Sequence, residues 1–178
     1  FPAGFYYKTF MWPKSFWYKV YEPFIRKAAG FGVASIKHDK ERYEHKYEYC
    51  DLLITGSGPS GLASAYAAAK NGARVILAED KPRFGGSLLT SEVTIGNQSG
   101  KEWANSIITE LKEMPNVIVK NRAQVFGYYD HNMLVMSERI NDHLPKSKKY
   151  SPKQRLWYIR AKEVVISSGS IERPLVFG

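Results

Sequence analysis

Cysteine is nearly absent from this chain: Cys50 is the single one among 178 residues. One cysteine cannot form an intrachain disulfide, which fits a reducing compartment. No apolar run approaches the ~20 residues that a membrane-spanning helix needs. A charged segment followed by an apolar one, as in a secretory signal, is also missing. We therefore expect a cytoplasmic protein with no membrane partner.

Clustered histidines are missing as well. The four histidines are scattered, and none has metal-ligand spacing with another histidine, a cysteine or a group of carboxylates. The sequence contains no G-x-S-x-G turn of the kind that exposes a hydrolase nucleophile. It therefore predicts no metal site and no hydrolase triad.

Acidic residues are scarce near the C-terminus, although the whole chain has a net charge of +9. Residues 139–162 contain eight Lys or Arg and one acid, Asp142. Such an excess can bind nucleic acid, an anionic membrane or an acidic partner. The nearby Trp157 and Tyr158 follow an alternating strand pattern and no nucleic-acid-binding module. We interpret the segment as a solvated hairpin and expect no nucleic-acid partner.

Aromatic residues are abundant in the first part of the chain, which we expect to be an arm and linker over residues 1–48. Helical spacing relates Phe16, Val20 and Phe24, and Pro23 should interrupt that helix. Since so many exposed aromatics are unfavourable in water, we expect the arm to pack on another surface, most simply that of a partner. Residues 39–49 are polar and predict a short helix or a linker.

Residues 49–178 alternate between apolar strands and helices. Strands are predicted over residues 51–55, 73–78, 116–120 and 163–167, and helices over 59–71 and from 99 to about 113. Alternating segments near residues 123–128, 133–139 and 156–161 predict an antiparallel meander. The expected fold class is α/β: a Rossmann-like FAD/NAD(P)-binding domain with a central parallel sheet and an inserted β-meander, preceded by the helical arm.

A glycine-rich turn joins the first strand to the first helix, and it consists of Gly56, Ser57, Gly58, Pro59, Ser60 and Gly61. The first glycine permits the tight turn, the second lets the backbone approach a pyrophosphate, and the third lets helix and strand pack closely. The helix N-terminus adds free N–H groups for the phosphates. The motif predicts binding of the ADP half of NAD or FAD.

An acidic residue follows at the spacing that this motif requires. Glu79 ends the second strand, eighteen residues after Gly61. A carboxylate there accepts hydrogen bonds from the ribose hydroxyls and repels a 2′-phosphate, which favours NAD or FAD over NADP. Asp80 is adjacent and is a secondary candidate.

The pair Gly85 and Gly86 extends this pattern, because an acid followed six residues later by Gly-Gly resembles the fingerprint of the two-dinucleotide-binding-domain flavoproteins. That resemblance implies a meander after the third strand and a small-residue turn beside the cofactor, here Ser167-Ser168-Gly169. It also implies that backbone groups near the adenine belong to Gln124 and Val125. The cofactor-binding set therefore also includes Gly85, Gly86, Ser87, Gln124, Val125, Ser168 and Gly169.

Four longer stretches, residues 1–13, 17–26, 125–132 and 168–177, resemble the alpha subunit of heterotetrameric sarcosine oxidase. The aromatic arm is much more diagnostic of this family than the glycine motif, which many enzymes share. The sequence departs from the usual pattern at Thr55 and Ser57, and Ser167-Ser168-Gly169 replaces the commoner Ala-Thr-Gly. All these changes are between small residues, so the backbone geometry should persist.

The resemblance implies an oxidoreductase that acts on the CH–NH group of sarcosine and yields glycine, hydrogen peroxide and, with tetrahydrofolate, methylene-tetrahydrofolate. It implies beta, gamma and delta subunits and the rest of an alpha chain as partners, with NAD in this domain, FMN at the alpha–beta interface and FAD in the beta subunit. We expect the domain to be incomplete at its C-terminus, without catalytic residues and inactive alone. Alternatives are FAD in place of NAD, a related amine or proline dehydrogenase, and a non-catalytic assembly module.

Overall fold

The fold was analysed in a computed structural model, which describes residues 12–30, 32, 34–144 and 150–170. Two compact units make up the chain, Phe1–Lys40 and Glu41–Gly178. The aromatic residues 1–11 and the family-like residues 171–177 lie outside the described residues. The boundary predicted between residues 48 and 49 falls inside the first strand of the second unit.

The first unit contains the helix that the spacing of its aromatics predicts. A π-helical turn, η1 (Trp17–Tyr21), leads directly into α2 (Glu22–Ala28). Pro23 occupies the first turn of α2, where its missing N–H is tolerated, and the wider turn comes immediately before it. Gly30 follows the helix with a φ of 72°, the left-handed conformation that commonly ends helices.

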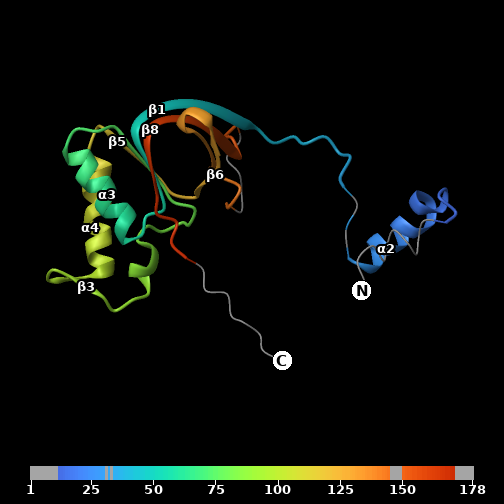
Figure 1. Ribbon diagram of the computed structural model, residues 1–178, viewed down its shortest axis with the longest axis horizontal. Coiled ribbons are helices and arrows are strands. Elements are labelled where there is room, and N and C mark those ends of the chain that lie inside the picture. Colours follow the sequence, from blue (N-terminus) through green and yellow to red (C-terminus); the bar gives the residue numbers. More distant parts are fainter. Residues whose placement is uncertain (1–11, 31, 33, 145–149, 171–178) are drawn as a thin grey trace. The chain divides into compact units, whose positions relative to one another are not determined.

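The second unit is built on two long parallel strands, β1 (Tyr43–Thr55) and β8 (Gln154–Ile166). They pair from Tyr43 with Gln154 to Thr55 with Ile166, and Figure 1 shows them curving side by side. The helix or linker predicted over residues 39–49 is therefore wrong for 43–49, which are strand. The two strands predicted near residues 156–161 and 163–167 are one continuous strand.

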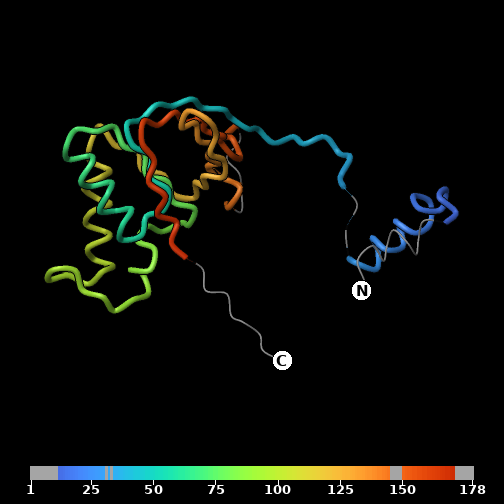
Figure 2. The backbone as a smooth tube through the Cα atoms, viewed as in Figure 1, coloured from blue at the N-terminus to red at the C-terminus, as the bar shows by residue number. Residues whose placement is uncertain are grey.

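The remaining strands extend this pair into a six-stranded sheet with the order β5-β2-β1-β8-β7-β6. They are β2 (Val75–Ala78), β5 (Val117–Lys120), β6 (Ala123–Tyr129) and β7 (Met133–Arg139). The four strands from β5 to β8 in this order are parallel, whereas β7 and β6 are antiparallel. The central parallel sheet and the meander are thus confirmed, and β8 belongs to both. Figure 2 shows the backbone of β8 running along β1.

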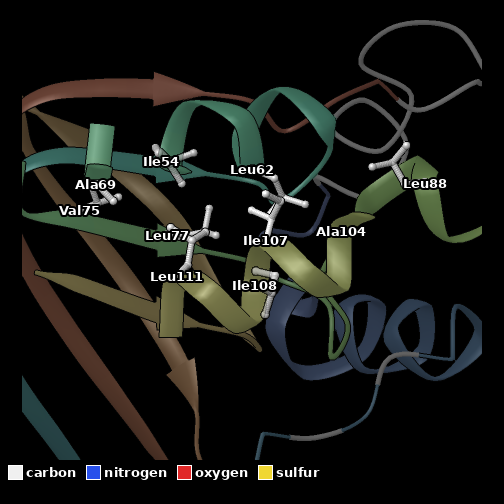
Figure 3. Packing of buried hydrophobic residues seen from close by; sticks show 11 residues of the cluster. Ile54, Leu62, Ala69, Val75, Leu77, Leu88, Ala104, Ile107, Ile108 and Leu111 are labelled. Carbon is white, nitrogen blue, oxygen red and sulfur yellow. The ribbon is translucent and has the colours of Figure 1, made fainter. Parts of the chain in front are cut away.

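Helices α3 (Pro59–Lys70) and α4 (Gly100–Glu113) pack on the parallel part of the sheet, and both were predicted. Figure 3 shows Leu62 of α3 and Ile107 and Leu111 of α4 meeting Ile54 and Leu77 of the sheet. The predicted start of α4 near residue 99 is confirmed by a capping box, in which the Ser99 hydroxyl accepts from the Glu102 N–H and the Glu102 carboxylate accepts from the Ser99 N–H.

A second core lies on the other face of β1 and β2, between them and the meander, and includes Leu53, Ile76, Leu134, Met136 and Trp157. Short elements complete the unit: η2 (Gly86–Leu89), the β3 (Thr94–Ile95) and β4 (Gln98–Ser99) hairpin, and η3 (Asp130–Asn132). In the part of the chain that the structure describes, no helix has the length and apolar character needed to cross a bilayer.

Candidate functional site

The carboxyl ends of the parallel strands meet at one edge of the sheet. Thr55 of β1 pairs with Ala78 of β2 and Ile166 of β8, and Ala78 pairs with Lys120 of β5. The glycine turn, Glu79 and the Ser-Gly turn all follow these strand ends. Open α/β sheets bind ligands at this edge, so the fold brings these predicted elements to the expected place.

Two glycines of the turn are required by the packing of the protein itself. Gly56 has a φ of 98°, and its N–H donates to the Ala78 carbonyl at 2.8 Å. A Cβ on Gly56 would overlap the carbonyl of Ser167, and one on Gly61 would overlap the carbonyl of Gly56. Because both contacts are with backbone, neither position can accept a side chain without displacing the turn.

Gly58 is different, since its φ is −68°, a value that any residue adopts. A Cβ there would meet no atom of the described residues within 4 Å. Gly58 is the N-cap of α3, Pro59 follows at the start of the helix, and no described side chain caps the first turn. The structure therefore has open space beside Gly58, at the positive end of a helix dipole.

Glu79 lies against the glycine turn and is buried. Its Oε2 accepts from the Ser57 N–H at 2.9 Å and also from the Ser57 hydroxyl. Its Oε1 accepts from the Lys81 N–H at 2.9 Å. These bonds satisfy the buried carboxylate and hold the predicted ribose-binding acid beside the turn.

The Gly85–Gly86 turn packs on the same loop. The Gly85 N–H donates to the Ser57 carbonyl at 3.0 Å and to the Ser57 hydroxyl at 3.2 Å. Gly86 has a φ of 52°, and a Cβ there would lie 2.9 Å from the Gly58 Cα. Ser87 follows, exposed, in η2. Contact with the first glycine turn therefore explains Gly86, whereas Gly85 is explained by its φ of 122°.

Asp80 is on the outer side of this cluster, and half of its side chain is exposed. Hydrogen bonding with the Glu79 side chain, and then the ion pair with Lys81 at 3.1 Å, keep the pKa of Asp80 below its usual value. Asp80 therefore adds negative charge next to Glu79.

The strand end after β8 contributes a residue that was not among the predicted site residues. The Ser167 N–H donates to the Thr55 carbonyl at 2.8 Å, and the Ser167 hydroxyl donates to the Gly56 carbonyl at 3.1 Å. Ser168 and Gly169 come next and are exposed beside the glycine turn. The resemblance placed Ser167 in the turn beside the cofactor, but no local pattern in the sequence indicated its contact with Gly56.

Gln124 and Val125 lie in β6, the first strand of the meander, rather than in the strand before it. Ala123, the first residue of β6, donates its N–H to the Glu79 carbonyl at 2.8 Å. Gln124 is exposed, whereas Val125 is half-buried against the second core. The structure therefore connects the start of β6 to Glu79 through the backbone.

Acids of β1 pair with two cations of the basic segment. Arg155 contacts Glu44 of β1 at 2.8 Å, and Lys162 contacts Asp51 of β1 at 2.8 Å. Residues 145–149 of the basic segment lie outside the described residues. Among the residues that are described, no three His, Cys, Asp or Glu side chains come together as metal ligands.

The fold and this edge define an α/β dinucleotide-binding domain. The chain belongs to the family described as FAD dependent oxidoreductase, whose sequence pattern matches residues 51–142. It is 47% identical to sarcosine oxidase subunit alpha of Rhizobium meliloti (strain 1021), over 99% of this chain and 18% of that protein. It is 36% identical to sarcosine oxidase subunit alpha of a Corynebacterium (strain U-96), over 84% of this chain and 16% of that protein.

The resemblance to this subunit is therefore confirmed, and the chain spans less than a fifth of the length of these relatives. Among solved structures, L-proline dehydrogenase from P. horikoshii superimposes with a TM-score of 0.58 at 19% identity, covering 82% of this chain and 27% of that one. At this identity the likeness shows the fold alone.

Proposed function

We propose that this chain forms the NAD-binding part of a sarcosine oxidase-type alpha subunit. The open space at Gly58 supports the proposal most directly. Packing accounts for the absence of a side chain at Gly56, Gly61 and Gly86, but nothing among the described residues accounts for it at Gly58. A pyrophosphate at the N-terminus of α3 would use that space and the N–H groups of the first turn.

The acidic side of the site favours NAD over NADP. Glu79 is held beside the glycine turn, and its Oε1 keeps a lone pair after accepting from the Lys81 N–H. A ribose hydroxyl can donate to such an oxygen, whereas a 2′-phosphate would face the negative charge of the adjacent Glu79 and Asp80 carboxyl groups. The proposed binding residues are those predicted from the sequence, with Ser167 supporting Gly56 and Gly61.

Calorimetric titration of the chain with NAD, NADP and FAD tests this proposal. We expect NAD to bind, NADP to bind more weakly, and Glu79→Ala to reduce the NAD affinity by about tenfold or more, since a charged hydrogen bond contributes ~1.5–3 kcal/mol. Glu113→Ala, which changes an exposed glutamate at the end of α4, is the matched control. Preferential FAD binding with a yellow chromophore would replace the NAD assignment by a flavin one.

The similarity to sarcosine oxidase subunit alpha supports a wider proposal about the complete protein. In it, this domain assembles in the cytoplasm with beta, gamma and delta subunits that oxidise the CH–NH group of sarcosine, with FAD, FMN and tetrahydrofolate bound elsewhere in the complex. No catalytic residue is assigned to the present chain, and we expect it alone to leave sarcosine unchanged. Hydrogen peroxide formation from sarcosine by the chain alone would contradict this expectation.

A second candidate function, a non-catalytic assembly module, is favoured by the exposed aromatics of the arm. Trp12, Tyr18 and Phe24 are each more than 70% exposed. Exposed aromatic patches of this kind usually mark partner surfaces. If the chain binds no dinucleotide but binds its partner subunits, assembly becomes the main role and the glycine turn a scaffold.

A further inference from the structure

The hydroxyl of Ser57 forms hydrogen bonds that join three parts of the candidate site. Ser57 is completely buried, so its side chain does not face the open space at Gly58. Its Oγ donates to Glu79 Oε2 and accepts from the Gly85 N–H at 3.2 Å. The turn, the ribose-binding acid and the Gly85–Gly86 pair therefore meet at one side-chain oxygen.

We propose that Ser57 is a positioning residue for nucleotide recognition, which acts through Glu79 by fixing the carboxylate in the orientation that receives the ribose hydroxyls. This inference rests on the proposed NAD site. A glutamate has three side-chain torsions, and fixing them before the ligand arrives reduces the entropic cost of binding. The Ser57 hydroxyl and N–H both bind Oε2, which directs Oε1 away from the turn.

The backbone at Ser57 does not depend on this hydroxyl. The Gly85 N–H also donates to the Ser57 carbonyl at 3.0 Å, and the Ser57 N–H still binds Glu79 when the hydroxyl is removed. Alanine at this position leaves a void of about one oxygen atom and leaves no backbone donor unpaired. Ser57→Ala should therefore fold, while its Glu79 carboxylate loses one of two bonds to Oε2.

A double-mutant cycle separates positioning from a merely structural role. We would measure the NAD dissociation constant of the unchanged chain, Ser57→Ala, Glu79→Ala and the double variant, with thermal melts to check folding. We expect Ser57→Ala alone to raise the NAD dissociation constant by about tenfold. This is the lower end of what a hydrogen bond to a charged group contributes. In the Glu79→Ala background the same change should have less than a twofold effect, because the group through which Ser57 acts is gone.

Ser91→Ala is the matched control, since Ser91 is exposed and lies outside the proposed binding residues. It should keep the unchanged NAD affinity in both backgrounds. If Ser57→Ala reduces the NAD affinity equally with and without Glu79, the positioning role is wrong but the proposed NAD site is not. The same conclusion follows if Ser57→Ala alone leaves the NAD affinity unaltered. If the unchanged chain binds neither NAD nor another dinucleotide, the proposed function itself fails.

Should Glu79→Ala unfold, Glu79→Asp replaces it in the cycle, because the shorter carboxylate is withdrawn from the ribose position.

Discussion

The glycines of the first turn lack a side chain for two different physical reasons. Gly61 is required by the carbonyl of Gly56, whereas a Cβ on Gly58 would lie in open space. We predict that Gly61→Ala destabilises the fold by ~1–3 kcal/mol through overpacking, and that Gly58→Ala leaves stability within about 0.5 kcal/mol but weakens NAD binding at least tenfold. Urea unfolding and calorimetric titration measure the two effects. A Gly58→Ala variant with full NAD affinity would contradict a pyrophosphate in that space.

The single thiol gives a second residue-scale prediction. Cys50 is buried, and burial, followed by the charge of Asp51, raises the pKa of its thiol to about 12. The reactive thiolate is therefore scarce below pH 9, and we expect a thiol reagent to modify Cys50 at least a hundredfold faster in denaturant than in buffer. Absorbance of the released reagent group follows the reaction. Fast labelling of the folded chain would show that β1 opens at this position.

The sequence predicted the tight turn at Gly56 and the close packing at Gly61 because both follow from spacing along one strand, turn and helix. It did not predict the bonds of the Ser57 hydroxyl, because they join residues 22 and 28 positions away. The contact between Ser167 and Gly56 was not predicted for the same reason, since 111 residues separate the two. Contacts of this kind are set by the order of the strands and not by any local pattern.

At the scale of elements, predictability follows from how local each stabilising interaction is. The start of α4 was predicted because Ser99 and Glu102 cap it within one turn. The first half of β1 was not, because Tyr43–Tyr49 is polar and is stabilised by pairing with β8, more than 100 residues later. The length of β1 is therefore determined by its tertiary partner, which overrides its local composition.

Asp51 joins three elements and gives a pH prediction at this scale. Its carboxylate on β1 contacts Lys162 of β8 at 2.8 Å and accepts from the Arg74 N–H, just before β2, at 2.8 Å. The bond with Lys162 and then those with Arg74 lower the pKa of Asp51 well below its usual value. The unfolded chain therefore binds a proton first as the pH falls, so this contribution is present above about pH 4 and is lost below it.

We expect Asp51→Asn to lower the stability at pH 7 and to reduce the loss of stability between pH 5 and pH 3, which urea unfolding at the two pH values would measure. Asp130→Asn, which changes an exposed aspartate in η3, should keep the pH dependence of the unchanged chain. If Asp51→Asn loses stability between pH 5 and pH 3 as steeply as the unchanged chain, other carboxylates cause that loss.

On the scale of the whole second unit, the sheet closes upon itself. β5 is one edge strand and β7 lies next to the other edge, yet Lys120 of β5 contacts Glu138 of β7 at 3.0 Å. The buried Glu138 also accepts from the Trp157 indole N–H at 2.7 Å and from Arg155 at 3.3 Å. The meander therefore folds over the parallel strands and encloses the second core.

This network also reaches the site, because the Lys120 carbonyl accepts from the Glu79 N–H at 2.9 Å. Local patterns predicted both the parallel sheet and the meander, but not the closure between them, because closure depends on the curl of the complete sheet. The charges of Lys120 and Arg155 and the indole N–H of Trp157 need Glu138 as their common partner inside this closed part.

We predict that Glu138→Ala destabilises the unit by ~3–5 kcal/mol, since it removes the acidic partner of the partly buried Lys120, leaves the buried indole N–H of Trp157 unpaired, and leaves Arg155 with Glu44 alone. Glu138→Gln should destabilise the unit less, because an amide oxygen can still accept from Trp157. Glu163→Ala, which changes an exposed residue on β8, is the control and should alter stability by no more than about 0.5 kcal/mol. Far-UV circular dichroism during urea unfolding would follow the sheet, and tryptophan fluorescence would follow Trp157 in a background in which Trp12, Trp17 and Trp103 are replaced by phenylalanine. Coincident transitions are expected in the unchanged chain, because one closed sheet carries both cores. If Glu138→Ala shifts the fluorescence transition alone, the meander unfolds independently and the closure does not couple it to the nucleotide edge.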